Sequence, residues 1–94
     1  MDVSSNPLVV TAADVAAGAV TVWTGNLHVK NVEFVKYTAI TDNATLNQGN
    51  GKVFAYLSAA SDLEAVKTNN VEWARGLVVP IHGITNGELH IYIM

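Results

Sequence analysis

The sequence predicts an all-β fold class: a small antiparallel β-sandwich or jelly-roll-like domain with short helical turns. Short runs rich in Val, Thr and aromatic residues alternate in polarity, and turn residues separate them at intervals typical of sandwiches. The chain has 94 residues and a mass of 10.0 kDa, enough for one domain with one core. No repeat or linker interrupts it, so we expect residues 1–94 to form a single domain with residues 1–7 as a polar lead-in.

The N-terminal strand candidates begin at Leu8-Val9-Val10, which can pair as a first strand. Thr11 and Asp14 have the spacing of a helix cap, in which each side chain can bond the other residue's backbone, so we expect one helical turn at a local corner. From Gly18 to Thr24 the alternation places Val20 and Val22 on one face, with Ala19, Thr21 and Trp23 on the other. The pair Gly25-Asn26 then permits a tight reversal.

The next segment, Leu27 to Tyr37, changes phase along its length. Leu27 and Val29 lie in step with each other, whereas Val32 and Phe34 lie in the opposite step. One extra residue near Lys30-Asn31 would repair the mismatch, so the pattern predicts a β-bulge there.

The middle of the chain predicts two strands around a turn. Asn43–Leu46 is a short strand candidate, residues 47–51 are a turn cluster, and Lys52–Leu57 is a strand with apolar groups on both faces, which we expect to be covered on both sides. The stretch from Ser58 to Asn70 is ambiguous. Its Ser61-Asp-Leu-Glu64 spacing allows a helical turn, but a helix or an irregular strand over 61–67 is equally compatible with it.

The C-terminal part predicts a long strand and a hairpin. From Val71 to Ile81 the alternation places Val71, Trp73, Leu77 and Val79 in phase, with an interruption at Gly76. Asn86-Gly87 has the chemistry of a two-residue hairpin turn, which would set Ile84 opposite Leu89. Leu89, Ile91 and Ile93 then share one face of the last strand.

Charge is scarce in this chain. Charged residues make up 14% of the sequence, against about 25% in ordinary soluble domains, and the net charge is −3. Much of the surface must therefore consist of small polar or apolar groups, and contiguous apolar surface usually marks a contact site. We therefore expect a homo-oligomer.

The charge pattern also excludes some partners. The five Lys and Arg residues are scattered over a chain of negative net charge, so we expect no nucleic-acid partner. The first 20 residues contain no Lys or Arg and their apolar content is interrupted, so we expect no signal peptide, no membrane partner and synthesis in a cytoplasm.

No grouping of residues indicates a metal or cofactor. The chain has no cysteine, His28 lies far from the other histidines in sequence, and the expected hairpin sends His82 and His90 to opposite faces. An oligomer axis could still gather copies of one histidine around a metal or an anion.

The chain also shows no signature of a catalyst. Ser58 and Ser61 lie in no strained nucleophile turn, and Asp62 and Glu64 form an ordinary solvated pair in a polar turn. We therefore expect a non-enzymatic protein without a cofactor.

The candidate interaction surface consists of four side chains on the predicted strands: Trp23, Trp73, His90 and Tyr92. Aromatic rings can also form a flat platform for sugars. A carbohydrate- or peptide-binding β-sandwich module is therefore the alternative to an assembly role, although most aromatic residues of so small a domain pack in its core.

The order VWTGNLHVKNVEFVKY, GKVFAYLSAA and RGLVVPIHGITNGELHIYIM resembles small β-sandwich virion proteins of tailed phages and prophages, of the head-decoration or tail-associated type. In such proteins a strand with a Trp two residues before a Gly precedes a long bent strand, a Gly-Lys strand and a closing hairpin. The resemblance covers about Pro7 to Met94. The matching positions, all structural, are Trp23, Gly25, Gly51, Lys52, Gly76, Leu77, Val79, Gly87, Leu89, Ile91 and Tyr92.

The resemblance implies a part of a virus particle. The chain lacks the coiled-coil or collagen-like extension of tail-fibre proteins, which leaves head decoration or another small virion component. The resemblance further implies self-association, commonly as a trimer, docking onto capsid or tail proteins, and location in the virion.

Overall fold

The structure, a computed structural model, describes residues 7–60 and 65–93. Within this part of the chain six strands and one short 3-10 turn follow one another, so the predicted all-β class is confirmed. They are β1 (Leu8–Thr11), η1 (Ala13–Val15), β2 (Val20–Val35), β3 (Asn43–Asn47), β4 (Val53–Ser58), β5 (Val66–Val79) and β6 (Glu88–Ile93).

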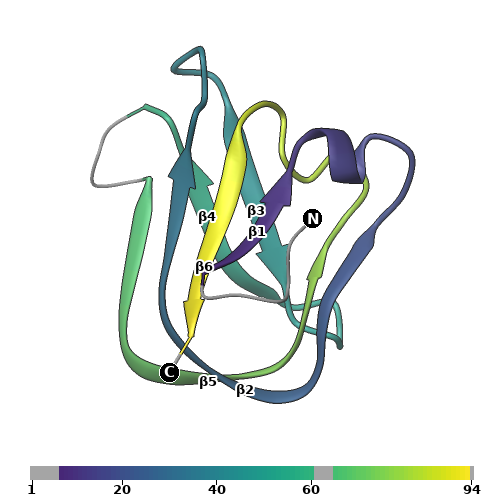
Figure 1. Ribbon diagram of the computed structural model, residues 1–94, viewed down its shortest axis with the longest axis vertical. Coiled ribbons are helices and arrows are strands. Elements are labelled where there is room, and N and C mark those ends of the chain that lie inside the picture. Colours follow the sequence, from purple (N-terminus) through teal and green to yellow (C-terminus); the bar gives the residue numbers. More distant parts are fainter. Residues whose placement is uncertain (1–6, 61–64, 94) are drawn as a thin grey trace.

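All six strands belong to one antiparallel sheet with the order β1-β6-β2-β5-β3-β4. The two longest strands, β2 and β5, pair along most of their length and curve together, as the lower part of Figure 1 shows. Their curvature folds the sheet onto itself. The sheet therefore makes two layers that face each other across the core.

Each bent strand contributes one segment to each layer. Layer A contains β1, β6, the segment Val29–Val35 of β2 and the first residues of β5. Layer B contains the segments Val20–Trp23 and Leu77–Val79, together with β3 and β4. The segments between them, Asn26–His28 and Trp73–Arg75, form what we term the closed end.

The strand order of the two layers is that of a jelly roll. When the two bent strands are each counted as two segments, the sheet has eight. Numbered along the chain, the segments follow the order 1-8-3-6 in layer A and 2-7-4-5 in layer B. Except for the β3–β4 hairpin, neighbours in each layer are thus distant in sequence, as two interlocked Greek keys require.

Two glycines accompany the bends at the closed end. Gly25 has φ +84° where the pairing of β2 with β5 shifts between Trp23 and Asn26, and Gly76 has φ +75° on the facing strand. A left-handed residue in a bulge bends a strand without ending it. The reversal predicted at Gly25-Asn26 is therefore wrong, because β2 continues through these residues.

The bulge predicted near Lys30 is confirmed. Against β6, the register of β2 passes from Val29 opposite Ile93 to Asn31 opposite Tyr92, so Lys30 is the extra residue. Val29 and Val32 are both fully buried as a result. The change of phase visible in the sequence thus has the expected cause.

The predicted C-terminal hairpin is wrong, because β6 pairs with β1 and β2 and not with residues 81–85. The turn chemistry explains the difference. Gly87 has φ +95°, but Asn86 does not have the positive φ that a type I′ turn needs. Instead, the Asn86 amide accepts a hydrogen bond from Gly87 N at 3.0 Å and donates one to Thr38 Oγ1 on the β2–β3 loop.

Residues 80–87 cross from one layer to the other. Ile84, which was expected opposite Leu89, forms a bridge with Ala44 of β3 in layer B, and Glu88 then begins β6 in layer A. The alternation of β6 was nevertheless predicted correctly, since Leu89 and Ile91 are fully buried.

The strand β4 also differs from the prediction, because only one of its faces is covered. Val53 is 62% exposed and Tyr56 is 60% exposed. The register passes from Leu46 opposite Ala55 to Asn47 opposite Val53, so Phe54 is an extra residue and lies inward together with Ala55. The bulge thus allows two consecutive apolar side chains, Phe54 and Ala55, to point into the core.

The strand β5 starts earlier than predicted, at Val66, and the residues Ser61–Glu64 of the ambiguous stretch lie outside the described part. Trp73 was expected in phase with Leu77, but Trp73 is 61% exposed and Leu77 is buried. The left-handed Gly76 between them changes the phase.

The core lies between the layers and is made of aliphatic side chains and two Phe rings. Its largest fully buried members are Phe34, Leu8, Leu46, Leu77, Leu89, Ile91, Val10, Val15, Val29, Val32 and Val79. The predicted corner after β1 closes one end of it. There Thr11 N donates to Asp14 Oδ2 at 2.9 Å, and Asp14 N donates to Thr11 Oγ1 at 3.3 Å.

Candidate interaction surface

The four side chains proposed from the sequence as an interaction surface do not lie together. Trp23 is on layer B, Trp73 is at the closed end, and His90 and Tyr92 are on layer A. Trp23 is 36% exposed and Trp73 61%, whereas His90 and Tyr92 are only partly exposed. Each position must therefore be considered with its own neighbours.

At the closed end, Trp73 packs on His28. The two residues are opposite each other on β5 and β2, and their ring centroids are 3.3 Å apart at a tilt of 55°. The next pair, Leu27 and Ala74, points inward and is buried. The Nε2 atom of His28 is buried without a hydrogen-bond partner, and the half-buried histidine ring packs against the more exposed indole.

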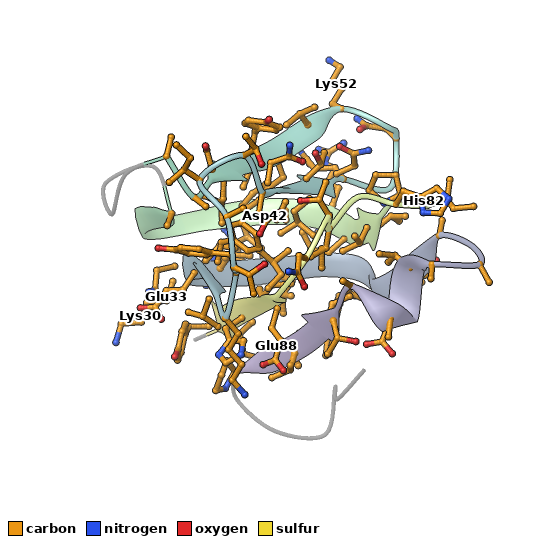
Figure 2. The ribbon with its side chains drawn as sticks, turned by 90° about the horizontal axis from the view of Figure 1, so that it is seen from above. Lys30, Glu33, Asp42, Lys52, His82 and Glu88 are labelled. Carbon is orange, nitrogen blue, oxygen red and sulfur yellow. The ribbon has the colours of Figure 1, made fainter. Side chains whose placement is uncertain are left out.

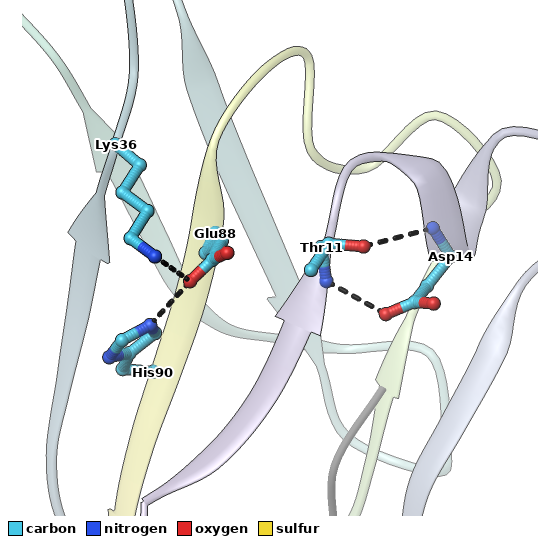
Figure 3. A network of polar contacts seen from close by, with 5 residues as sticks. All are labelled: Thr11, Asp14, Lys36, Glu88 and His90. Atoms are coloured by element: carbon cyan, nitrogen blue, oxygen red, sulfur yellow. Dashed lines mark hydrogen bonds and ion pairs between the residues drawn. The ribbon is translucent and has the colours of Figure 1, made fainter.

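The outer face of layer A carries a small charged network. His90 Nε2 donates to Glu88 Oε1 at 2.9 Å, and Lys36 Nζ lies 3.5 Å from the same oxygen, as Figure 3 shows. The hydrogen bond from His90, and then the charge of Lys36, hold the pKa of Glu88 below its ordinary value. Glu33 on β2 is directly opposite His90 in the register. Layer A is therefore an ionic face.

The Glu88 network should make stability depend on pH at the acid end. A carboxyl group with a lowered pKa stabilises the fold above its unfolded value of about 4.5, and this contribution is lost as pH falls through the lower folded value. We expect Glu88→Gln to lower the free energy of unfolding at pH 7 by no more than about 1 kcal/mol. The difference from wild type should vanish at pH 2 in urea titrations, and an equal difference at both pH values would contradict the assignment.

The outer face of layer B has a different character, because its strand segments contain no Asp, Glu, Lys, Arg or His. One row of outward residues crosses all four segments through cross-strand pairs: Thr21, Val78, Asn47 and Val53. The next rows pair Thr45 with Tyr56 and Asn43 with Ser58. Charged groups lie at its borders, where Figure 2 shows Lys52 at the tip of the β3–β4 hairpin.

Four exposed large apolar residues were not among those proposed from the sequence. They are Ile40 at 75%, Val53 at 62%, Tyr56 at 60% and Ile81 at 52% exposed. Ile40 and Ile81 lie in loops, whereas Val53 and Tyr56 lie on β4, the last strand of the sheet. The sequence already shows that β4 has apolar residues on both of its faces. We interpreted this pattern as two covered faces, whereas one of them is exposed.

Among the described residues no three His, Asp or Glu side chains come close enough to hold a metal ion. His82 lies in a turn with φ +56° and its backbone N donates to Val15 O at 2.8 Å, and Ser58 accepts a hydrogen bond from Ala60 N at 3.1 Å. A depression on the surface is lined by Thr21, Val22, Trp23 and Thr24. The described part of the chain also has no helix long and apolar enough to cross a membrane.

Comparison with known proteins gives no assignment: no family model, no curated protein and no solved structure matches this chain. The geometry of the two faces is therefore the basis for a functional proposal.

Proposed function

We propose that this chain is a non-enzymatic structural protein that associates with itself and docks as a small phage virion component, in capsid decoration or in association with the tail. The observation that carries the proposal is the uncharged outer face of layer B, from which Val53 and Tyr56 protrude. Charged side chains oppose association because they lose their hydration when a contact buries them. This surface has none, so its contact with another uncharged surface has only a small desolvation cost.

The jelly-roll strand order agrees with this role without deciding it. Jelly rolls occur in viral capsid proteins and in lectin domains, and a fold by itself implies no function. The resemblance to virion proteins and the low charge content favour the first of these roles.

Two measurements test the proposal. Size-exclusion chromatography with light scattering at micromolar concentration should give a homo-oligomer, and the resemblance favours a trimer. Mass spectrometry of purified phage particles from the source strain should detect the chain in proportion to capsid or tail proteins. A monomer that is absent from particles would contradict the proposal.

A carbohydrate-binding module is the second candidate, and the exposed Trp73 favours it. The indole is supported from beneath by His28, and the exposed polar residues Asn26 and Arg75 lie beside it at the closed end. Stacking of a sugar ring on an exposed indole is a common mode of recognition. A glycan array should then give a specific signal that Trp73→Ala abolishes and Trp23→Ala retains, and an array without signal would exclude this candidate.

A further inference from the structure

We infer that Asn50, at the tip of the β3–β4 hairpin, is a site of spontaneous covalent modification, at which the side-chain amide is converted to aspartate and isoaspartate. This inference does not depend on the proposed self-association. The sequence contains two Asn-Gly pairs, Asn50-Gly51 and Asn86-Gly87. A glycine after the asparagine favours this reaction, because it has no Cβ atom to shield its nitrogen or to restrict its backbone. The structure exposes the first pair and encloses the second.

The reaction needs water but no enzyme and no oxidant. After its proton passes to the solvent, the backbone nitrogen of Gly51 attacks Cγ of Asn50, so that an N–Cγ bond forms while the Cγ–Nδ2 bond breaks and ammonia leaves. The product is a five-membered succinimide ring, and its formation is favoured because the two reacting groups belong to adjacent residues. Water then opens the ring at either carbonyl group. One opening gives aspartate, and the other gives isoaspartate, in which the main chain runs through the former side chain and is longer by one methylene group.

The Asn50-Gly51 pair has the access and the room that this ring requires. Both residues are exposed. Asn50 Oδ1 accepts a hydrogen bond from Lys52 N at 3.0 Å, which draws electrons from the amide carbon and folds the side chain along the next peptide units. In the described part of the chain the departing Nδ2 atom has no hydrogen-bond partner. Nothing lies within 4 Å of the position that a Cβ atom of residue 51 would take.

One hydrogen bond at the tip must open before the attack. Gly51 N donates to Gln48 O at 3.0 Å, so the nitrogen can react only when this contact breaks. The turn is exposed, and Gly51 has a φ of +88°, which glycine adopts and leaves without strain. An opening of this kind is local and leaves the strands paired.

The Asn86-Gly87 pair is protected from the same reaction. Its amide is bonded at both ends, since Oδ1 accepts from Gly87 N at 3.0 Å and Nδ2 donates to Thr38 Oγ1. Ring formation must rotate the peptide unit between the two residues, and isoaspartate must lengthen the chain there. The backbone of residues 35–37 leaves no room for either change, because a Cβ atom on Gly87 would lie 2.5 Å from Val35 O.

The modification changes the border of layer B. Each event adds one negative charge to a chain of net charge −3, two residues before Lys52. The isoaspartate form also lengthens the turn that Gln48 N closes by donating to Lys52 O at 2.8 Å. Gly49 N donates to Arg75 O at 2.9 Å and joins this turn to the closed end. The tip is therefore where ageing of the protein alters its surface charge.

Peptide mapping of the full chain tests the inference. The folded protein is incubated in mildly alkaline buffer, sampled over time and digested with trypsin, which places Asn50 in the peptide 37–52 and Asn86 in the peptide 76–94. Mass spectrometry then measures the gain of one dalton in each peptide. We expect the gain at Asn50 to be at least about ten-fold faster than the gain at Asn86. In concentrated urea the two rates should converge, because the enclosure of Asn86 is lost.

Two variants assign the rates to the contacts described. Asn50→Gln keeps the amide but would need a six-membered ring, so the peptide 37–52, which also contains Asn43 and Asn47, should lose its mass gain. Thr38→Val removes the acceptor of the Asn86 amide and should speed the reaction at Asn86 in the folded chain. Circular dichroism checks that both variants keep the β-sheet.

Two results would overturn the inference. One is a mass gain at Asn86 as fast as that at Asn50 in the folded chain, and the other is a gain in the peptide 37–52 that persists in Asn50→Gln. Neither result bears on the oligomeric state or on the presence of the chain in virions, which test the proposed function separately.

Discussion

Gly87→Ala is expected to lower the free energy of unfolding by at least about 3 kcal/mol, among the largest effects of a single substitution in this chain. Gly87 has φ +95°, and a Cβ atom there would lie 2.5 Å from Val35 O and 2.9 Å from Tyr37 N. Both atoms belong to the backbone, one in the last residue of β2 and one just after it, so neither can move aside as a flexible side chain would. The substitution combines backbone strain with a collision.

Two other glycines serve as matched controls for these two causes. Gly25 has φ +84° but nothing within 4 Å of its Cβ position, so Gly25→Ala should cost only the left-handed strain, about 1–2 kcal/mol. Gly18 has neither the positive φ nor a neighbour, so Gly18→Ala should stay within about 0.5 kcal/mol of wild type. Urea denaturation measures all three, and a Gly87→Ala variant as stable as Gly25→Ala would contradict the close approach of residues 35–37.

Deletion of residues 91–94 is expected to abolish soluble folding. Ile91 is fully buried and lies opposite Leu8 of β1 and Val32 of β2, both of them buried too. Loss of such a side chain costs about 2–5 kcal/mol, against a total stability of about 5–15 kcal/mol for an ordinary domain. The deletion also removes the partner of Leu8 in β1, which among the described residues pairs only with β6.

Circular dichroism and heteronuclear NMR spectra measure this effect. The truncated chain should show no cooperative thermal transition and poor dispersion of amide signals. The full-length variant Tyr92→Ala changes an outward side chain of the same strand, and it should retain the wild-type spectrum with a modest loss of stability. A truncated chain that unfolds cooperatively would show that β6 is dispensable.

Local pattern was sufficient to predict the elements that depend on neighbouring residues. The alternation of β6, the cap between Thr11 and Asp14, and the bulge at Lys30 all follow from spacing along the chain, and the structure confirms them. In each case the buried face or the hydrogen bond involves residues only a few positions apart. Such features need no knowledge of the partner strand.

Long-range pairing was not predictable in the same way. The Asn86-Gly87 pair is typical of a hairpin, but a hydrogen bond to Thr38 and a bridge from Ile84 to Ala44 direct the chain to the other layer. These partners are some forty residues away in sequence. The preference of a turn for one geometry is small compared with the gain from placing β6 between β1 and β2 in the core.

The candidate surface illustrates the same limit. The aromatic and imidazole residues Trp23, Trp73, His90 and Tyr92 were selected by type, and the fold distributes them over three regions. The uncharged outer face of layer B arises from segments that are separate in sequence and adjacent only after the sheet bends. A sequence shows that charge is scarce, whereas only the topology shows from which face it is missing.

The dependence of self-association on salt tests the central claim most directly. Contact between uncharged faces should be insensitive to screening, which weakens ionic interfaces strongly at high salt. Sedimentation velocity of the wild-type chain should therefore give the same oligomer in dilute buffer and at about 1 M NaCl, where the screening length is about 3 Å. Dissociation into monomers at high salt would show that the ionic face of layer A, and not layer B, holds the copies together.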